Sequence, residues 1–524
     1  MQAASASYER RDPESGLLHR VIREHFATLR ELEREDEGSG LPVFVENEFA
    51  AFIGCGSLSR GFVRLRCRAC GLDRFLGFSC KSRTICPSCS ARRMHQVTEN
   101  LIGRALPDVP IRQWVLSPPP ALVGLLGAKG EVLAAMNRFF VSAVQRQLER
   151  RAKALGIDGG RSGAVTFLQR FSATLRLFPH AHSLVFDGVF TKDGDARPSF
   201  HPLAAPTSED VEAVASEVAR KLAKRLEKLG LVNEVSDEPE KATPLSRWCA
   251  AVQRERDGLA VVDEAGKVEP VQRRSTSRHT GEAHGFSVHA GVRVAALDRE
   301  GRTRLCRYVA RPPFAEVQLS ETADGRIALE LSKPHASGAS HVVLEPLAFV
   351  RRLAWLVPPP FRNQTIYSGV LAAGSKWRKE IIPQEAHREI SLPSDGAPFT
   401  SRPNLESLEP LRVPAGAESA GRVTDSLARA GSPTPASLPQ PSVRVSAPSR
   451  GDADVDEVDL ERPYWIPWSE LLKRVYQIDI ACERCGGRLE AIALITDLAV
   501  ARKILLHVGL PADIPRFARP RGPP

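Results

Sequence analysis

The chain has 524 residues, which is long enough for about two to four domains that each bury a hydrophobic core. It is basic, with 72 Lys and Arg against 62 Asp and Glu, a formal net charge of +10 and a pI near 9.2, and this balance favours a polyanionic partner. No apolar run reaches the ~18 residues that a membrane span needs, and no apolar segment follows the polar N-terminus, so the sequence argues against a membrane or secreted protein and predicts an intracellular one.

The first 45 residues are predicted to be a helical segment. Residues 15–36 carry apolar side chains at helical spacing with charged side chains between them, which predicts an amphipathic helix that packs through one face. Residues 41–54 form a second, shorter apolar stretch that ends where the cysteines begin.

Residues 46–105 are predicted to be a zinc-binding domain. Six of the ten cysteines fall between Cys55 and Cys89, and in a reducing compartment such clustering favours metal sites over disulfides. Two Cys-x-x-Cys pairs have the spacing of a closed, structural four-thiolate zinc site, and they are Cys67, Cys70, Cys86 and Cys89. We rank Cys55 and Cys80 as spares that could replace a member of this set or join a second, incomplete site. The alternative is a group of free thiols in a small core.

Basic side chains surround these cysteines and predict a cationic face on the domain. They are Arg60, Arg64, Arg66, Arg68, Arg74, Lys81, Arg83, Arg92 and Arg93. Phosphate contacts are the expected use of such a face, and a merely solvated surface is the alternative.

Residues 106–390 contain an ordered succession of predicted strands and helices. Residues 113–120 read as a buried strand ended by prolines, and an apolar stripe over residues 132–148 predicts a long core helix. Two strands follow, over about 163–171 and 181–190.

The second half of this region contains another helix and two further motif-bearing segments. Residues 208–229 are predicted to be helical, with Ser208 as the N-cap and Gly230 as the stop. Residues 233–282 are polar and irregular and predict a mobile insertion. A strand over 285–294 and a segment that contains Tyr308 come next.

Two histidines lie at the start of the strand predicted over residues 181–190, with His182 on the strand and His180 just before it. Because successive side chains of a strand point to opposite faces, His180 and His182 emerge on the same side, with Ala181 between them. Neutral imidazoles held in fixed register suit a divalent cation. A His-x-His pair also arises often by chance, so a metal site is predicted here only if other motifs of the sequence support it.

The C-terminal part is predicted to contain a linker and a small last segment. Pro, Ser, Ala and charged residues dominate residues 391–460 and predict a disordered linker. Residues 461–524 would form a short amphipathic helix near Trp465, a Cys482-x-x-Cys485 pair and a final helix capped by Thr496. The Cys pair is half a zinc ribbon that needs partners, with Cys55 and Cys80 as candidates, or it is a relic.

Several of these motifs, in this order, resemble the insertion-sequence-91 family of transposases, which belong to the HUH class. They are the run Gly163–Phe171, the His180 and His182 pair, Asp187–Phe190 and Leu305–Pro313, preceded by Phe78–Lys81 and Cys86–Met94 in the cysteine-rich region. The resemblance covers about residues 10–385 and the C-terminal sixty or so. It implies an α+β fold, with an HUH nuclease domain whose central antiparallel sheet is flanked by helices, an N-terminal four-cysteine zinc module that recognises DNA, and a small C-terminal domain.

The resemblance also implies a function. The protein would be a transposase, bound to the nucleoid in the cytoplasm, that acts on single-stranded DNA at the element ends and on target DNA. It would nick and rejoin the strand through a 5′-phosphotyrosine intermediate in rolling-circle-like transposition, with structural Zn2+ and catalytic Mg2+ or Mn2+. A rolling-circle replication initiator and a non-catalytic, zinc-dependent DNA-binding protein are the alternatives.

Individual residues take roles through the same resemblance. His180 and His182 would hold the catalytic ion, with His289 preferred over Asp187 as the third ligand. Tyr308 would be the nucleophile, and Arg307 and Arg311 would balance the charge of the phosphate.

The tyrosines depart from the pattern of the founding members, which use two tyrosines four residues apart on one helix. Position 312 is Pro here, so the single-tyrosine common-region branch of the family fits better. Tyr367, in a second family-like stretch, is the alternative nucleophile.

Overall fold

The computed structural model describes residues 13–37, 40–232, 279–334, 338–360, 362–383, 482 and 484–520. Three predicted features lie outside these residues, wholly or nearly so: the insertion over 233–282, the linker over 391–460 and the amphipathic helix near Trp465. Among the helices described, none is both long and apolar enough to cross a membrane.

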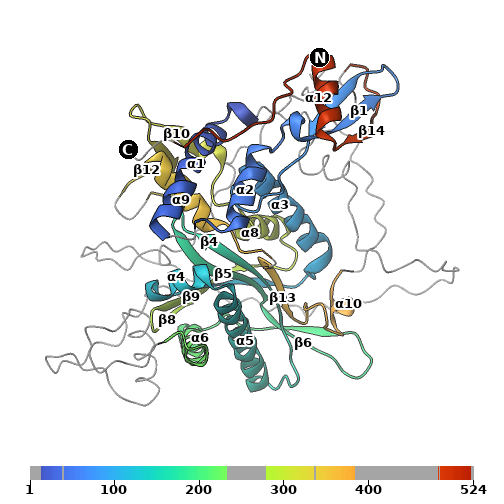
Figure 1. The fold of residues 1–524 in the computed structure, drawn as a ribbon. Helices are drawn as coiled ribbons and strands as arrows, with labels where there is room; N and C mark the ends of the chain where they lie inside the picture. The colour runs from blue at the N-terminus through green and yellow to red at the C-terminus, as the bar shows by residue number, and fades with distance from the viewer. Residues whose placement is uncertain are drawn as a thin grey trace.

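A six-stranded sheet forms the centre of the molecule (Figure 1). Its strands in spatial order are β13 (Thr365–Gly369), β4 (Gly163–Phe171), β5 (Leu177–Phe186), β3 (Ile111–Ser117), β9 (Phe286–Val294) and β8 (Thr280–Ala283). All neighbouring strands pair antiparallel. The predicted α+β fold with a central antiparallel sheet is therefore confirmed.

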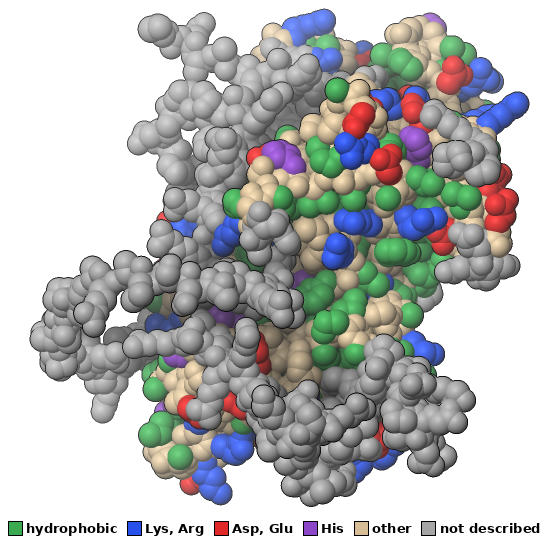
Figure 2. All heavy atoms as spheres, turned by 90° about the vertical axis from the view of Figure 1, so that its left-hand side faces the viewer, with side chains coloured by type: hydrophobic (Ala, Val, Ile, Leu, Met, Phe, Trp, Pro, Cys, Tyr) green, Lys and Arg blue, Asp and Glu red, His purple; other side chains and the backbone are tan. Residues whose placement is uncertain are grey.

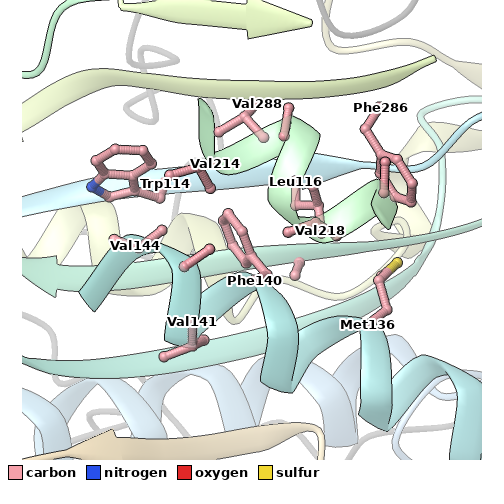
Figure 3. Close-up of a cluster of buried hydrophobic side chains, with 14 of the residues drawn as sticks. Trp114, Leu116, Met136, Phe140, Val141, Val144, Val214, Val218, Phe286 and Val288 are labelled. Atoms are coloured by element: carbon pink, nitrogen blue, oxygen red, sulfur yellow. The ribbon is translucent and has the colours of Figure 1, made fainter. Parts of the chain in front are cut away.

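Two long helices cover one face of the sheet, α5 (Gly130–Ala154) and α6 (Ser208–Lys228), with α4 (Pro120–Ala128) beside them. Alternate side chains of β3 point toward these helices, so Trp114 and Leu116 join a core that also contains Phe140 and Val218 (Figure 3). This core contains the apolar stripe that predicted α5.

The predicted caps of two helices are each wrong by one residue. The N-cap of α6 is Thr207, not Ser208: its hydroxyl accepts the Asp210 N–H at 3.2 Å, while the Asp210 carboxylate accepts the Thr207 N–H at 3.0 Å. This reciprocal capping box satisfies two donors that a cap at Ser208 would leave unpaired. In α12 (Leu498–His507) the cap is Asp497, not Thr496, because the Asp497 side chain accepts the N–H of Val500.

The other face of the sheet packs against α8 (Arg299–Val309), α3 (Pro87–Asn100) and the π-helical turn Leu101–Ala105 that continues α3. Leu184 and Phe186 of β5 share this second core with Leu305 and Val309 of α8. Because β5 is buried on both faces, its polar side chains are held among apolar neighbours instead of water.

A third layer contains the N-terminal helices and packs against the β4–β5 turn through Phe171, Leu175 and Leu177. It comprises α1 (Leu17–Glu37), α2 (Val43–Ile53), α9 (Pro346–Leu356) and a sheet of β10 (Leu319–Glu321), β11 (Ile327–Glu330) and β12 (His341–Leu344). Phe26 of α1 stacks on Phe49 of α2 with ring centroids 4.2 Å apart. Both predicted N-terminal apolar segments are thus helices.

Basic and acidic side chains are interspersed on the face of the molecule seen in Figure 2.

Segments from both ends of the chain form one further unit, which we call the chain-end module (Figure 1). It consists of η2 (Leu58–Arg60), β1 (Phe62–Cys67), β2 (Asp73–Gly77), β14 (Leu489–Ile495) and α12, with the strand order β14-β1-β2. The C-terminal segment that was predicted to be separate therefore completes the sheet of the predicted zinc-binding domain. The remaining elements are η1 (Pro13–Ser15), η5 (Glu316–Gln318), α10 (Arg378–Ile381) and the hairpin of β6 (Gly188–Thr191) and β7 (Ser199–Pro202).

Candidate active site and cysteine clusters

The two predicted metal-binding histidines lie side by side in the middle of the central sheet. His180 and His182 of β5 have ring centroids 4.8 Å apart, and their side chains are 9% and 4% exposed. They point to the face covered by α8, because they alternate with Ala181, which belongs to the core on the opposite face. The strand therefore presents two imidazoles in fixed register, as the sequence predicts.

The surroundings of both imidazoles favour the neutral form. Burial lowers the pKa of His180 to about 4, and burial together with the nearby charges of His180 and Arg311 lowers the pKa of His182 well below its usual value. His180 Nδ1 donates to the Phe178 carbonyl at 2.7 Å, so its Nε2 carries the lone pair. A neutral ring with a free Nε2 is the form that binds a cation.

The second imidazole is oriented by a neighbouring amide. The Gln113 amide nitrogen Nε2 on β3 lies 2.9 Å from His182 Nδ1, so in this orientation the amide donates to Nδ1 and the ring proton is on Nε2. Rotation of the amide by 180° would place its oxygen on Nδ1–H and leave Nε2 of His182 with a lone pair. Gln113 had no predicted role, although a buried glutamine in the middle of a buried strand is a signal for one.

The ring of Tyr308, in the last turn of α8, lies against His182. The two ring centroids are 5.6 Å apart and the rings are nearly perpendicular, at 87°. The structure therefore brings the predicted nucleophile to the predicted metal-binding pair from a segment more than a hundred residues away in the sequence.

The two predicted arginines flank this tyrosine. Arg311 lies just beyond the end of α8, and its guanidinium carbon is 5.2 Å from the centre of the Tyr308 ring. The Nε atoms of Arg307 and Arg311 are both buried, and each lacks a hydrogen-bond partner within the described part of the chain. Both guanidinium groups therefore keep donors for an anion.

The two candidates for a third metal ligand do not join the histidine pair. Among the described residues, three ligand atoms of His, Cys, Asp or Glu lie within 4.8 Å of one another only at the cysteines, so His289 on β9 does not complete a compact set with His180 and His182. The Asp187 carboxylate accepts hydrogen bonds from Arg112 at 2.7 and 2.9 Å and from Arg293 at 2.8 Å. Its lone pairs are therefore engaged in a buried ion network.

A glutamine that the sequence analysis missed occupies the position beside the pair. Gln169 of β4 lies directly opposite His180 in the strand register, so both side chains share one face of the sheet. Its Nε2 donates to the Val309 carbonyl at 2.9 Å, while its Oε1 is buried without a partner among the described residues. A buried amide oxygen without a donor is a candidate ligand for a hard cation.

The alternative nucleophile lies elsewhere on the same face. Tyr367 on the edge strand β13 pairs in register with Val165, and its ring lies 5.1 Å from the guanidinium carbon of Arg378. Burial raises the pKa of the Tyr367 phenol, which disfavours the phenolate. Of the two described tyrosines, Tyr308 is the one whose ring contacts the histidines.

Eight cysteines form two separate four-sulfur clusters among the described residues. The prediction that Cys67, Cys70, Cys86 and Cys89 form one site is therefore wrong. The α3 cluster contains Cys55, Cys80, Cys86 and Cys89, and the chain-end cluster contains Cys67, Cys70, Cys482 and Cys485. The predicted set mixed two residues from each, because the two Cys-x-x-Cys spacings are alike. The predicted spares, Cys55 and Cys80, complete the α3 cluster instead of binding the C-terminal pair.

The geometry of the α3 cluster fits a structural zinc ion. Its Sγ atoms are 3.8 Å apart for Cys55 and Cys86, 3.7 Å for Cys55 and Cys89, and 3.5 Å for Cys80 and Cys89. Four sulfurs at ~2.3 Å from a tetrahedral zinc ion would lie ~3.8 Å apart. Backbone N–H groups also point at two sulfurs, from Cys80 to Cys55 Sγ and from Ser82 to Cys80 Sγ, each at 3.4 Å. Such donors stabilise thiolates.

Two family models match the chain. The model described as "Transposase zinc-binding domain" matches residues 21–118, and the model described as "Putative transposase" matches residues 163–379. The first span contains the whole α3 cluster but only two members of the chain-end cluster, and the second contains both histidines and Tyr308. Comparison with curated proteins and with solved structures gave no match.

Proposed function

The chain is a transposase of the insertion-sequence-91 family with an N-terminal zinc-binding domain, and we propose that it nicks and rejoins single-stranded DNA through a covalent bond to Tyr308. The observation that carries this proposal is the contact of the Tyr308 ring with His182, beside His180 and on one face of the sheet. A phenol and a pair of neutral imidazoles at one place suit attack on a phosphate.

His180, His182 and Gln169 are the residues that would hold the Mg2+ or Mn2+ ion. Burial favours the neutral form of both imidazoles by lowering their pKa, and the Gln169 Oε1 atom supplies the carbonyl oxygen that these ions favour. A bound divalent ion would supply Lewis acidity at the scissile phosphate.

The side chains of this chain then divide the work of strand cleavage. The Tyr308 oxygen attacks phosphorus as its proton passes to water, the bond from phosphorus to the 3′ oxygen breaks, and that oxygen takes up a proton from water and leaves as a 3′-hydroxyl. Arg307 and Arg311 donate to the phosphate oxygens as negative charge builds up, because their Nε atoms have no other partner among the described residues. Attack by a 3′-hydroxyl on the phosphotyrosine reverses the step and joins the strand.

A covalent-adduct assay tests the nucleophile. Wild-type protein is incubated with Mn2+ and a single-stranded oligonucleotide from the element end, labelled on the 3′ side of the nick, and denatured adduct is counted. We expect Tyr308→Phe to abolish the adduct and the matched variant Tyr367→Phe to retain it. An adduct that survives in Tyr308→Phe refutes the assignment. Absence of any adduct from folded wild-type protein favours the non-catalytic DNA-binding alternative.

A metal titration tests the ligand set without a chelator, which would also remove zinc. We expect Gln169→Leu to raise the Mn2+ concentration needed for half-maximal nicking by about tenfold or more, and His289→Phe to change it little. The reverse ranking would restore His289 as the third ligand. Defined element ends around the gene would separate a transposase that moves DNA from a replication initiator that shares this chemistry.

A further inference from the structure

Four cysteines that are distant in the sequence meet in the chain-end module, and the span of the zinc-binding family model contains only Cys67 and Cys70 of them. Cys67 and Cys485 are 418 positions apart in the sequence, and Cys70 and Cys482 are 412 apart. We propose that these four cysteines bind a second structural zinc ion, which clasps the two ends of the chain into one zinc ribbon. This inference does not depend on the strand-transfer chemistry proposed above.

Strand pairing explains how the two Cys-x-x-Cys loops come together. β1 runs antiparallel to β14 from Phe62 opposite Ile495 to Cys67 opposite Leu489. The loop that follows β1 and the loop that precedes β14 therefore lie at the same end of the ribbon. The ion pair of Arg68 with Glu490, at 2.6 Å, lies at this same end.

The two loops share a backbone hydrogen bond and a glycine with a left-handed backbone angle. The Cys67 carbonyl accepts the Gly71 N–H at 2.9 Å, and the Cys482 carbonyl accepts the Gly486 N–H at 2.7 Å. Both glycines have left-handed backbone angles, with φ of +73° and +71°. Each loop is thus a tight turn that aims two thiols at one point, and two such turns facing each other make a four-thiolate site.

The sulfur positions fit a tetrahedral ion and not disulfides. The Sγ atoms of Cys67 and Cys485 are 3.5 Å apart, those of Cys70 and Cys482 are 3.4 Å apart, and all four lie within 4.8 Å of one another. The edge of a tetrahedral zinc thiolate is ~3.8 Å, whereas a disulfide bond is ~2.05 Å. A four-sulfur set with this shape selects zinc or iron, and in a purely structural role we assign zinc.

Gly487 shows that the backbone packs directly against the sulfurs. A Cβ atom at this position would lie 3.2 Å from Cys67 Sγ and 3.3 Å from Cys485 Sγ. A side chain at this position would require the sulfurs to shift by a few tenths of an ångström, so glycine suits a backbone that lies against a metal site.

The chain-end module has too little apolar packing to hold its two segments together well without a metal. Among the residues that the structure describes, its hydrophobic cluster has four buried members, Leu58, Phe62, Ala501 and Leu505. Small units of this kind usually need a metal or disulfides, and a structural zinc ion contributes its binding energy directly to folding.

The first test is the metal content of the full-length wild-type protein, measured by elemental analysis and native mass spectrometry. We expect two zinc ions per chain and no iron. One zinc ion per chain overturns the proposal even if no variant can be purified, and iron in place of the second zinc overturns the assignment of the metal. A mass lower by two hydrogens per bond after denaturation without reductant would reveal disulfides and also overturn it.

Paired variants then locate the second ion. Cys67→Ser with Cys70→Ser, and Cys482→Ser with Cys485→Ser, should each lose the same ion, so the fourfold variant should still hold one zinc. Cys55→Ser with Cys89→Ser should lose the other ion, and the control Cys306→Ser should keep both. If Cys482 and Cys485 can be replaced with no loss of zinc, the proposed site shared by the four cysteines does not exist.

Thiol labelling of the wild-type protein gives a readout that needs no variant. Cys485 is exposed to solvent and should react quickly with a maleimide if it is a free thiol. We expect it to be protected until zinc is removed, and then to become reactive together with Cys67, Cys70 and Cys482. Rapid labelling of Cys485 in zinc-replete protein contradicts the proposal.

Discussion

The central sheet and the chain-end module are stabilised in different ways. Helices bury both faces of the sheet, and its larger core alone includes Trp114, Met136, Phe140 and Phe286. The chain-end module has only four buried members in its cluster and a set of thiols instead of a large core. Hydrophobic burial holds polar side chains in place in the central sheet, whereas the chain-end module depends on the zinc ion that we propose for it.

Removal of zinc should give the largest difference between the two regions. Structural zinc contributes on the order of 10 kcal/mol in small zinc-dependent units, so we expect β1 and β14 to lose nearly all hydrogen-exchange protection after chelation. Amides of β4 and β5 should keep theirs. Hydrogen exchange with mass spectrometry measures the protection of both sets of strands in one sample. Continued protection of β14 after verified zinc loss would show that the chain-end module does not depend on zinc.

Truncation of a side chain in the core of the central sheet should destabilise the sheet and leave the zinc ions in place. Phe140→Ala leaves a cavity beneath the sheet and should lower the free energy of unfolding by about 3–5 kcal/mol, without changing the zinc content. Thermal or urea denaturation measures the loss. Leu155→Ala, at a position that is 67% exposed, is the control and should change stability by about 0.5 kcal/mol or less.

The buried ion network at the end of β5 should show a slightly smaller effect. Asp187→Ala would leave Arg112, which is 4% exposed, buried without its carboxylate and should destabilise the protein by about 3 kcal/mol. Glu300→Ala removes an exposed pair with Arg304 and should cost about 0.3–0.5 kcal/mol. Equal losses for the two variants would show that Asp187 has no such structural role.

The smallest effects should come from the two helix caps, one in each region. Thr207→Ala and Asp497→Ala each remove a side chain that accepts a backbone N–H, at a cost of about 1 kcal/mol. We expect Thr207→Ala to lower the denaturation midpoint of the whole molecule. Asp497→Ala should instead increase amide exchange in α12 alone, and a global effect of Asp497→Ala would mean that the module and the sheet unfold as one unit.

The sequence was most informative where the pattern is local. Strand alternation placed His180 and His182 on one face, and helical spacing located α1, α5 and α6, because each depends on residues a few positions apart. Only the resemblance to a family predicted Tyr308 as the nucleophile, because no local sequence pattern predicts that α8 packs against the sheet.

The sequence failed where partners are distant or the signal is a single polar residue. Identical Cys-x-x-Cys spacings cannot say which pairs share an ion, and the answer depends on the pairing of β1 with β14. Cys55 and Cys80 have no spacing signal at all. Gln169 could have been noticed as a polar residue in an apolar strand, but its place opposite His180 depends on the strand register.

The pairing of β1 with β14 has a consequence for synthesis on the ribosome. Cys67 is made 418 positions before its neighbour Cys485, so at ~5–20 residues per second the first half of the ribbon must wait roughly 20–80 s for its last strand. A polypeptide whose translation stops early would carry a complete α3 cluster and histidine strand but an open ribbon.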